Sequence, residues 1–196
     1  MDKLPLRSEI DAADKWRLED LYENDDIWEK DFKKVSKLCE KPKEYKGRLA
    51  ESGEILLECY KLQEKISMTL EKLYVYARMR KDEDNGIAKY QEMASRIEVL
   101  ITQFQAEMAF FEPELLAVGK KKIMKFLKET PGLGDYDFTF QEMFRLQEHV
   151  LSEKEERLLA MAQECAGTGD EAFSMFNNAD VKFPSIKAVS YTHLVP

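Results

Sequence analysis

The sequence predicts an all-α protein built around a long antiparallel helical hairpin plus shorter helices, and three observations support this prediction. Apolar residues recur at spacings of three and four over two runs of roughly 25 residues each, as in amphipathic helices. A short turn-forming segment separates the two runs. The chain has only 8 Gly and 6 Pro in 196 residues, with 44% apolar and 35% charged residues, which favours a folded, helix-rich protein.

Residues 1–25 form an N-terminal arm that precedes the first helix. The arm is an acidic stretch that contains Trp16, Leu18, Leu21 and Tyr22. Apolar residues scattered in this way favour an arm that lies on a folded body rather than a free tail. The first helix is expected over about residues 27–37, and its N-cap is expected to be Asn24, Asp25 or Asp26.

Residues 26–112 are predicted to form a helical lobe that contains the long hairpin. Ser52 is the expected N-cap of the first long helix. The apolar stripe of that helix comprises Ile55, Cys59, Leu62, Ile66, Leu70, Leu73 and Ala77. The string K-D-E-D-N-G at residues 81–86 predicts a turn, since Asn and Gly tolerate left-handed backbone.

A second stripe follows the turn and predicts a helix that ends at Pro113. It comprises Ile87, Tyr90, Met93, Ile97, Leu100, Phe104, Met108 and Phe111. Because the connection is short, the two helices must be antiparallel neighbours. The stripe needs no cofactor to explain it, because apolar residues at this spacing pack as a core.

Shorter elements are predicted in residues 113–187. A short element of a little more than one turn is expected at 114–118, a helix at 121–128, a break at 130–134 and a helix at 136–146. Ser152 and Glu155 match a capping box for a helix over 153–166, and another short helix is expected at 171–177. Alternating residues at 179–184 suggest a first β-strand near the C-terminus.

Charge and composition argue against several classes of protein. The net charge of −8 argues against a nucleic-acid surface, which requires a basic face. Four lysines at 120, 121, 122 and 125 fit a solvated helix face. No run approaches the ~18 apolar residues of a membrane span. Residues 1–11 show no secretory signal, so a cytoplasmic location is expected.

Histidines and cysteines, which often act as metal ligands or catalytic groups, are few in this sequence, and their spacing matches no known motif. The two histidines, His149 and His193, belong to no H-E-x-x-H or paired E-x-x-H motif. The three cysteines, Cys39, Cys59 and Cys165, form no C-x-x-C and are expected to be reduced thiols. Phosphate-binding loops and G-x-S-x-G are absent. We therefore assign no catalytic residue and no metal ligand, and the substrate-binding residues stay undetermined.

Five strings in order resemble the N-terminal region of oligoendopeptidase F. They are W-R-L-E-D-L-Y at 16–22, followed by Trp28; Y-A-R-M-R-K-D-E-D-N at 76–85; F-F-E-P-E-L-L at 110–116; H-V-L-S-E-K-E-E-R-L-L-A at 149–160; and A-F-S-M-F-N-N-A-D-V-K-F-P-S-I at 172–186. Together they cover about residues 16–187.

This resemblance implies a cytoplasmic zinc metallopeptidase of the thimet-oligopeptidase type, which cuts short peptides in a channel between helical lobes. Zinc in that family is held by H-E-x-x-H and a downstream glutamate, and this sequence contains none of them. The chain is therefore expected to be an N-terminal lobe that walls the channel. By itself it is expected to bind no zinc and to be inactive, because the zinc site would lie in a C-terminal catalytic region, which is expected to be its missing partner.

The resemblance stops after Lys187. Residues 188–196, A-V-S-Y-T-H-L-V-P, resemble translated adapter or assembly read-through, although a genuine divergent C-terminal strand remains open. Two alternatives to the peptidase lobe also stay open. One is a stand-alone helical scaffold or interaction protein that uses the hairpin as a binding surface, and the other is a separately encoded regulatory homologue.

Overall fold

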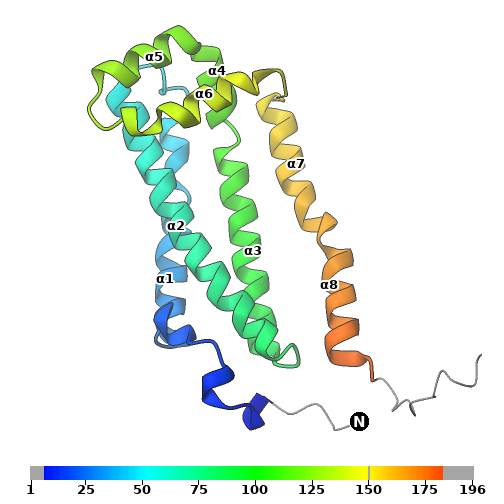
Figure 1. Cartoon of the computed structure of the whole chain (residues 1–196). Helices are drawn as coiled ribbons and strands as arrows, with labels where there is room; N and C mark the ends of the chain where they lie inside the picture. The colour runs from blue at the N-terminus through cyan, green and yellow to red at the C-terminus, as the bar shows by residue number, and fades with distance from the viewer. Residues whose placement is uncertain (1–6, 150, 183–196) are drawn as a thin grey trace, which may run out of the picture.

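The structure is all-α, as predicted. The computed structural model describes residues 7–149 and 151–182, and those residues contain no strand. The helices are α1 (Asp25–Leu38), α2 (Gly53–Glu83), α3 (Ala88–Met108), α4 (Phe111–Val118), α5 (Lys120–Glu129), α6 (Asp137–Arg145), α7 (Glu153–Ala166) and α8 (Thr168–Met175). In Figure 1, α1, α2 and α3 run side by side, α4–α6 lie across one end, and α7 and α8 line the other side of α3.

The predicted hairpin is confirmed in α2 and α3. Ser52 caps α2, with its hydroxyl accepting a hydrogen bond from Ile55 N at 3.3 Å. At the turn, Gly86 N donates to the Asp84 carboxylate at 2.8 Å. Most of the predicted stripe residues are buried; those of α2 include Cys59, Ile66, Leu70, Leu73 and Ala77, and those of α3 include Met93, Ile97, Leu100, Phe104 and Met108. This shared apolar seam is the centre of the core.

Helix α1 and the arm attach to the hairpin as expected. Asn24 is the N-cap of α1, accepting from Ile27 N at 3.1 Å. Trp28 is fully buried and donates its indole N–H to the Leu73 carbonyl oxygen of α2 at 2.9 Å. Leu18 and Tyr22 of the arm are buried as well. The arm therefore lies on the folded body.

Two predicted boundaries after the hairpin are wrong. Helix α3 ends at Met108, and Pro113 lies inside the first turn of α4. Proline is tolerated there because the first helical N–H groups have no intrahelical acceptor. The short element expected at 114–118 is therefore the body of α4, which starts earlier, at Phe111. Helix α8 runs over Thr168–Met175, three residues earlier at its start than the predicted 171–177.

The predicted β-strand at 179–184 is also wrong where the structure describes it. Ala179 and Asp180 belong to a π-helical turn, Phe176–Asp180, closed by a hydrogen bond from Val181 N to the Phe176 carbonyl oxygen at 2.8 Å. Alternating residues form a strand only beside a pairing partner, and the described residues supply none. Residues 183 and 184 lie outside the described part of the chain, as does the tail at 188–196.

Gly53 and Thr130 approach closely where the start of α2 meets the C-terminal end of α5. A Cβ atom on Gly53 would lie 2.0 Å from Thr130 Oγ1 and 3.0 Å from Thr130 Cβ. Thr130 is itself buried. Only glycine therefore fits at the first position of α2 without a shift of Thr130.

We predict that Gly53→Ala lowers the free energy of unfolding by about 1–3 kcal/mol, the usual cost of overpacking. Urea denaturation measures it. The matched control is Gly169→Ala, because a Cβ there meets nothing within 4 Å. Adding Thr130→Ala to Gly53→Ala should restore part of the loss, since it removes the nearest atom. Equal effects of the two glycine substitutions would contradict this account.

Candidate functional site

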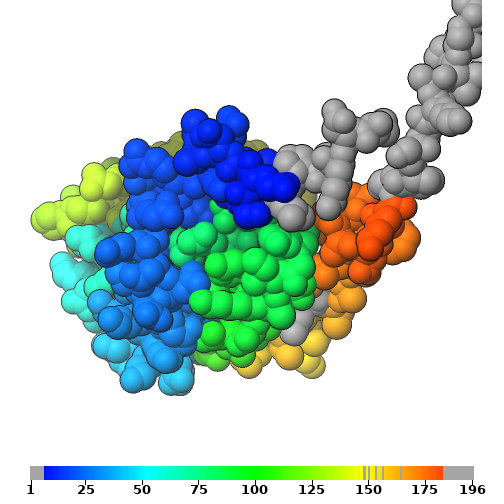
Figure 2. Space-filling model, turned by 90° about the horizontal axis from the view of Figure 1, so that it is seen from below, coloured from blue at the N-terminus to red at the C-terminus, as the bar shows by residue number. Residues whose placement is uncertain are grey.

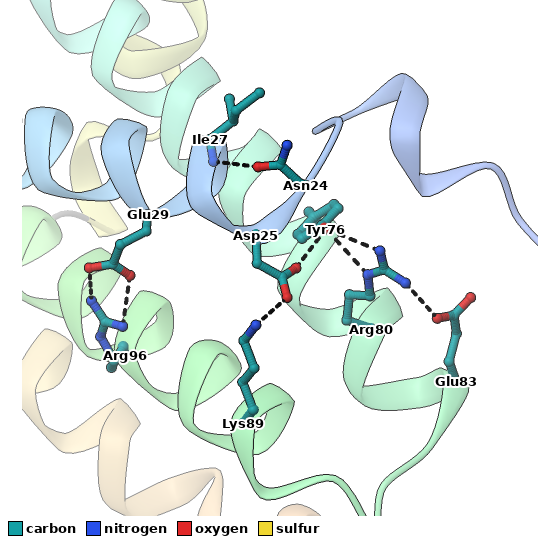
Figure 3. Close-up of polar contacts among 9 residues, drawn as sticks. All are labelled: Asn24, Asp25, Ile27, Glu29, Tyr76, Arg80, Glu83, Lys89 and Arg96. Carbon is teal, nitrogen blue, oxygen red and sulfur yellow. Dashed lines mark hydrogen bonds and ion pairs between the residues drawn. The ribbon is translucent and has the colours of Figure 1, made fainter.

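A polar network at the turn end of the hairpin joins helices α1, α2 and α3 (Figure 3). At its centre Tyr76 donates its hydroxyl hydrogen to Asp25 Oδ1 at 2.8 Å, and Lys89 Nζ donates to Asp25 Oδ2 at 2.5 Å. Arg80 donates to the Tyr76 oxygen at 3.3 Å. One carboxylate of α1 therefore binds groups from both arms of the hairpin.

The network extends from Arg80 to the N-terminal arm. Arg80 Nη1 lies 3.3 Å from Glu83 Oε2, and Arg7 of the arm forms an ion pair with the same glutamate. Nearby, Arg96 of α3 makes two hydrogen bonds with Glu29 of α1, at 2.9 and 3.0 Å. These contacts join the N-terminal arm and α1 to the two helices of the hairpin, α2 and α3.

Burial and partners shift the pKa values of the central groups. Burial raises the pKa of Asp25, but the hydrogen bonds from Lys89 and Tyr76 outweigh it and keep that pKa below the ordinary value. Burial raises the pKa of the Tyr76 phenol to about 12. Asp25 is therefore an anion and Tyr76 a neutral donor at neutral pH. The network is suited to holding the arm in place, and neither Asp25 nor Tyr76 changes its protonation state near neutral pH.

A second polar feature lies between the hairpin and α8. Lys81 of α2 is buried, and its Nζ lies 3.0 Å from Glu171 Oε1 of α8. A cavity of about 340 Å³ adjoins this pair, lined also by Ser95 and Met175. Burial, with the charge of Glu171 next, raises the pKa of the neighbouring Glu98. A charged contact therefore links α8 to the hairpin.

The residues that could carry chemistry are not brought together. His149 is exposed in the turn Gln147–His149, while His193 lies outside the described residues. Cys39 and Cys59 are buried, and burial raises their thiol pKa values to about 11 and about 12. Cys165 is exposed. Within residues 7–149 and 151–182, no three His, Cys, Asp or Glu side chains are grouped so that they could hold a metal ion.

The residues of the polar network were missed by sequence reasoning. Tyr76, Arg80 and Glu83 are spaced by four and three, so a shared face of α2 could have been recognised from the sequence. Their partners Asp25 and Arg7 lie more than fifty residues away in the chain, and no local pattern reports that contact.

Comparison with known proteins finds one family throughout. A family model described as Oligopeptidase F matches residues 114–183. The chain is 42% identical over 186 residues to Oligopeptidase PepF of Bacillus subtilis and 38% identical over 181 residues to Group B oligopeptidase PepB of Streptococcus agalactiae. These alignments cover 95% and 92% of this chain, but only 28% and 30% of the relatives.

A solved structure supports the same relationship. The crystal structure of oligoendopeptidase-F from Enterococcus faecium superposes with a TM-score of 0.78 at 29% sequence identity. The match covers 83% of this chain and 32% of that one. The chain thus spans about a third or less of the length of the proteins it resembles. No helix among the described residues is long and apolar enough to cross a membrane.

We predict that Asp25→Asn lowers the free energy of unfolding at neutral pH by about 1–3 kcal/mol, since hydrogen bonds to a charged group are lost. The folded-state pKa of Asp25 is lowered, so its contribution is present above the ordinary pKa of 3.8 and is lost as pH falls through the folded value. Urea denaturation from neutral to strongly acidic pH should show the two proteins converging. Asp26→Asn, an exposed neighbour in the same helical turn, is the matched control and should change little.

We also predict a coupled effect of Lys81 and Glu171. Glu171→Gln leaves the buried Lys81 ammonium without this anionic partner and should lower the free energy of unfolding by about 1–3 kcal/mol. The double variant with Lys81→Met should recover most of this loss, because neither charge remains. Asp170→Asn serves as the control. Additive losses in the double variant would show that the two side chains do not interact.

Proposed function

The chain corresponds to the N-terminal region of the oligopeptidase F family, and on that basis we propose that it forms the N-terminal helical lobe of a cytoplasmic zinc metallo-oligopeptidase that hydrolyses short peptides. The observation that carries the proposal is the 42% identity to Oligopeptidase PepF over 95% of the chain. In this role the helices form one wall of the peptide channel and restrict access to short, unstructured substrates. The three cysteines, none of them in a disulfide, fit a reducing compartment.

Zinc chemistry does not fit the residues described here. A catalytic zinc site needs three protein ligands and an open position for water. The described chain offers one histidine, His149, and no group of three potential ligands. We therefore derive no catalytic step from these residues. In the proposed enzyme, the zinc ligands and the general base belong to the two-thirds of the relatives' length that this chain does not span.

The surface of α7 and the residues after it supports a contact with a further body. None of the α7 side chains that the structure describes is buried. Large apolar side chains are exposed at Leu158, Leu159, Met161, Phe173 and Phe176, from 54% to 64%. Apolar residues gathered on one exposed segment mark an interaction surface. We propose that the catalytic region packs against this segment, which we call the α7–α8 face.

A chimera tests the proposal. Residues 1–182 of this chain would replace the aligned segment of Bacillus subtilis PepF, and hydrolysis of a fluorogenic short peptide would be measured with zinc and after chelation. We expect the chimera to be active and zinc-dependent and the isolated chain to be inactive. Peptide hydrolysis or stoichiometric zinc binding by the pure 196-residue chain would overturn the proposal.

Substitutions on the α7–α8 face test its role in the same chimera. Leu158→Glu should lower kcat/KM at least tenfold, because a charge would be buried at the contact. Phe138→Glu is the control: Phe138 is 76% exposed, but it lies on α6. It should change kcat/KM less than twofold. In the isolated chain neither substitution should alter the free energy of unfolding by more than about 0.5 kcal/mol, as for other surface changes.

A further inference from the structure

A cavity of about 470 Å³ lies between the N-terminal arm and the turn end of the hairpin. Figure 2 shows this end of the molecule, with the arm in dark blue lying against the green residues of the hairpin. The cavity is lined by Arg7, Lys15 and Trp16 from the arm and by Arg80, Ile87 and Tyr90 from the hairpin. Its volume is within the range of ~300–1,000 Å³ that small-ligand sites have.

The charge of this cavity opposes that of the whole protein. Four cationic side chains line it, against three carboxylates, in a chain with a net charge of −8. Two of these carboxylates have partners, because Glu83 binds both Arg7 and Arg80 and Asp84 accepts from Gly86 N. A further cation, Arg17, pairs with Asp20, and the third carboxylate is Glu19. Lys15 has no ion-pair partner among the described residues. The cavity therefore offers the Lys15 ammonium to an incoming anion, beside the paired guanidinium groups of Arg7 and Arg80.

The same cavity presents apolar surface. Trp16 is 60% exposed and Ile87 is 41% exposed, although both are large side chains that the fold could have buried. The Tyr90 ring lies 5.6 Å from the Arg80 guanidinium, which completes an aromatic and cationic wall. A ligand that suits the site thus combines an anionic group with an apolar side chain.

The cavity is also lined by residues from two of the sequence segments that resemble oligoendopeptidase F. Trp16 begins the string at 16–22, and Arg80 lies in the string at 76–85. Other contacts hold these strings together, since the Tyr22 ring packs edge-on against Tyr76 at 5.4 Å. The site is consequently built on a fixed frame and not on two independent segments.

We propose that this cavity binds the free C-terminal carboxylate of a short peptide whose last side chain is apolar. Lys15 donates hydrogen bonds to the carboxylate, as cations do to carboxylates elsewhere. The Arg7 guanidinium, held by Glu83, adds positive charge beside it. Trp16 and Ile87 contact the apolar side chain. The choice of a peptide rests on the proposed function; the requirement for a carboxylate and an apolar group rests on the cavity alone.

Tryptophan fluorescence gives a direct test. The chain has two tryptophans, and Trp28 is fully buried, so a ligand in the cavity should perturb Trp16 alone. The probes are N-acetyl-phenylalanyl-leucine and its C-terminal amide, titrated into the full chain. We expect a saturable signal with the acid and at least tenfold weaker binding of the amide. Lys15→Gln should weaken acid binding at least fivefold, while Lys121→Gln, an exposed lysine on α5, should leave it unchanged.

Other results would overturn the site. They are equal affinity for acid and amide, no saturable signal, an unchanged affinity in Lys15→Gln, or a signal that persists in Trp16→Phe. Circular dichroism of each variant confirms that the helices are intact, and calorimetry measures binding where the fluorescent residue is absent. The titration involves neither zinc nor hydrolysis. A negative outcome therefore removes this site without touching the chimera test of the peptidase proposal.

Discussion

The apolar seam between α2 and α3 is the constraint on which the rest of the structure depends. Leu73 of α2 and Ile97 of α3 are fully buried in it. Every other part of the described chain attaches to this pair. Trp28 of α1 donates to the Leu73 carbonyl, α5 meets the start of α2 at Gly53 and Thr130, and α7 packs along α3. Burial of apolar surface supplies most of the driving force, and the hydrogen bonds select one arrangement.

The two ends of the hairpin differ in how they are held. Near the start of α2, Thr130 packs closely against Gly53, and Glu114 of α4 accepts backbone hydrogen bonds from Gly47 N and Leu49 N at 2.7 and 2.9 Å. At the turn, contact is electrostatic, through Asp25, Tyr76 and Arg80. Ion pairing of Arg7 with Glu83 adds to the burial of Leu18 and Tyr22 in holding the arm against the hairpin. A cavity bordered by the arm can therefore keep a defined shape while remaining open to solvent.

The sequence predicted the helices well where the periodicity was long and the caps were local. Ser52, the candidate Asn24 and the capping box at Ser152 and Glu155 were recognisable in the sequence. In each cap, the side chain bonds to a group only three residues further along the chain, so a local pattern reveals it. The strand predicted at 179–184 was wrong over the described residues 179–182, because alternation in a short segment does not reveal whether a partner strand exists. The candidate site was unpredictable for a related reason: the contacts of Arg7 with Glu83 and of Lys81 with Glu171 depend on how separate segments pack.

The chain spans about a third or less of the length of the peptidases that it resembles. Its described residues form a helical body with an exposed α7–α8 face, and they contain no group of three metal ligands. We propose that the chain is the N-terminal lobe of a longer peptidase. The decisive measurement is to sequence the source DNA across the codons for Lys187 and Ala188 and to translate onward. We expect a reading frame that continues into H-E-x-x-H. A genuine stop codon directly after Pro196 would contradict it.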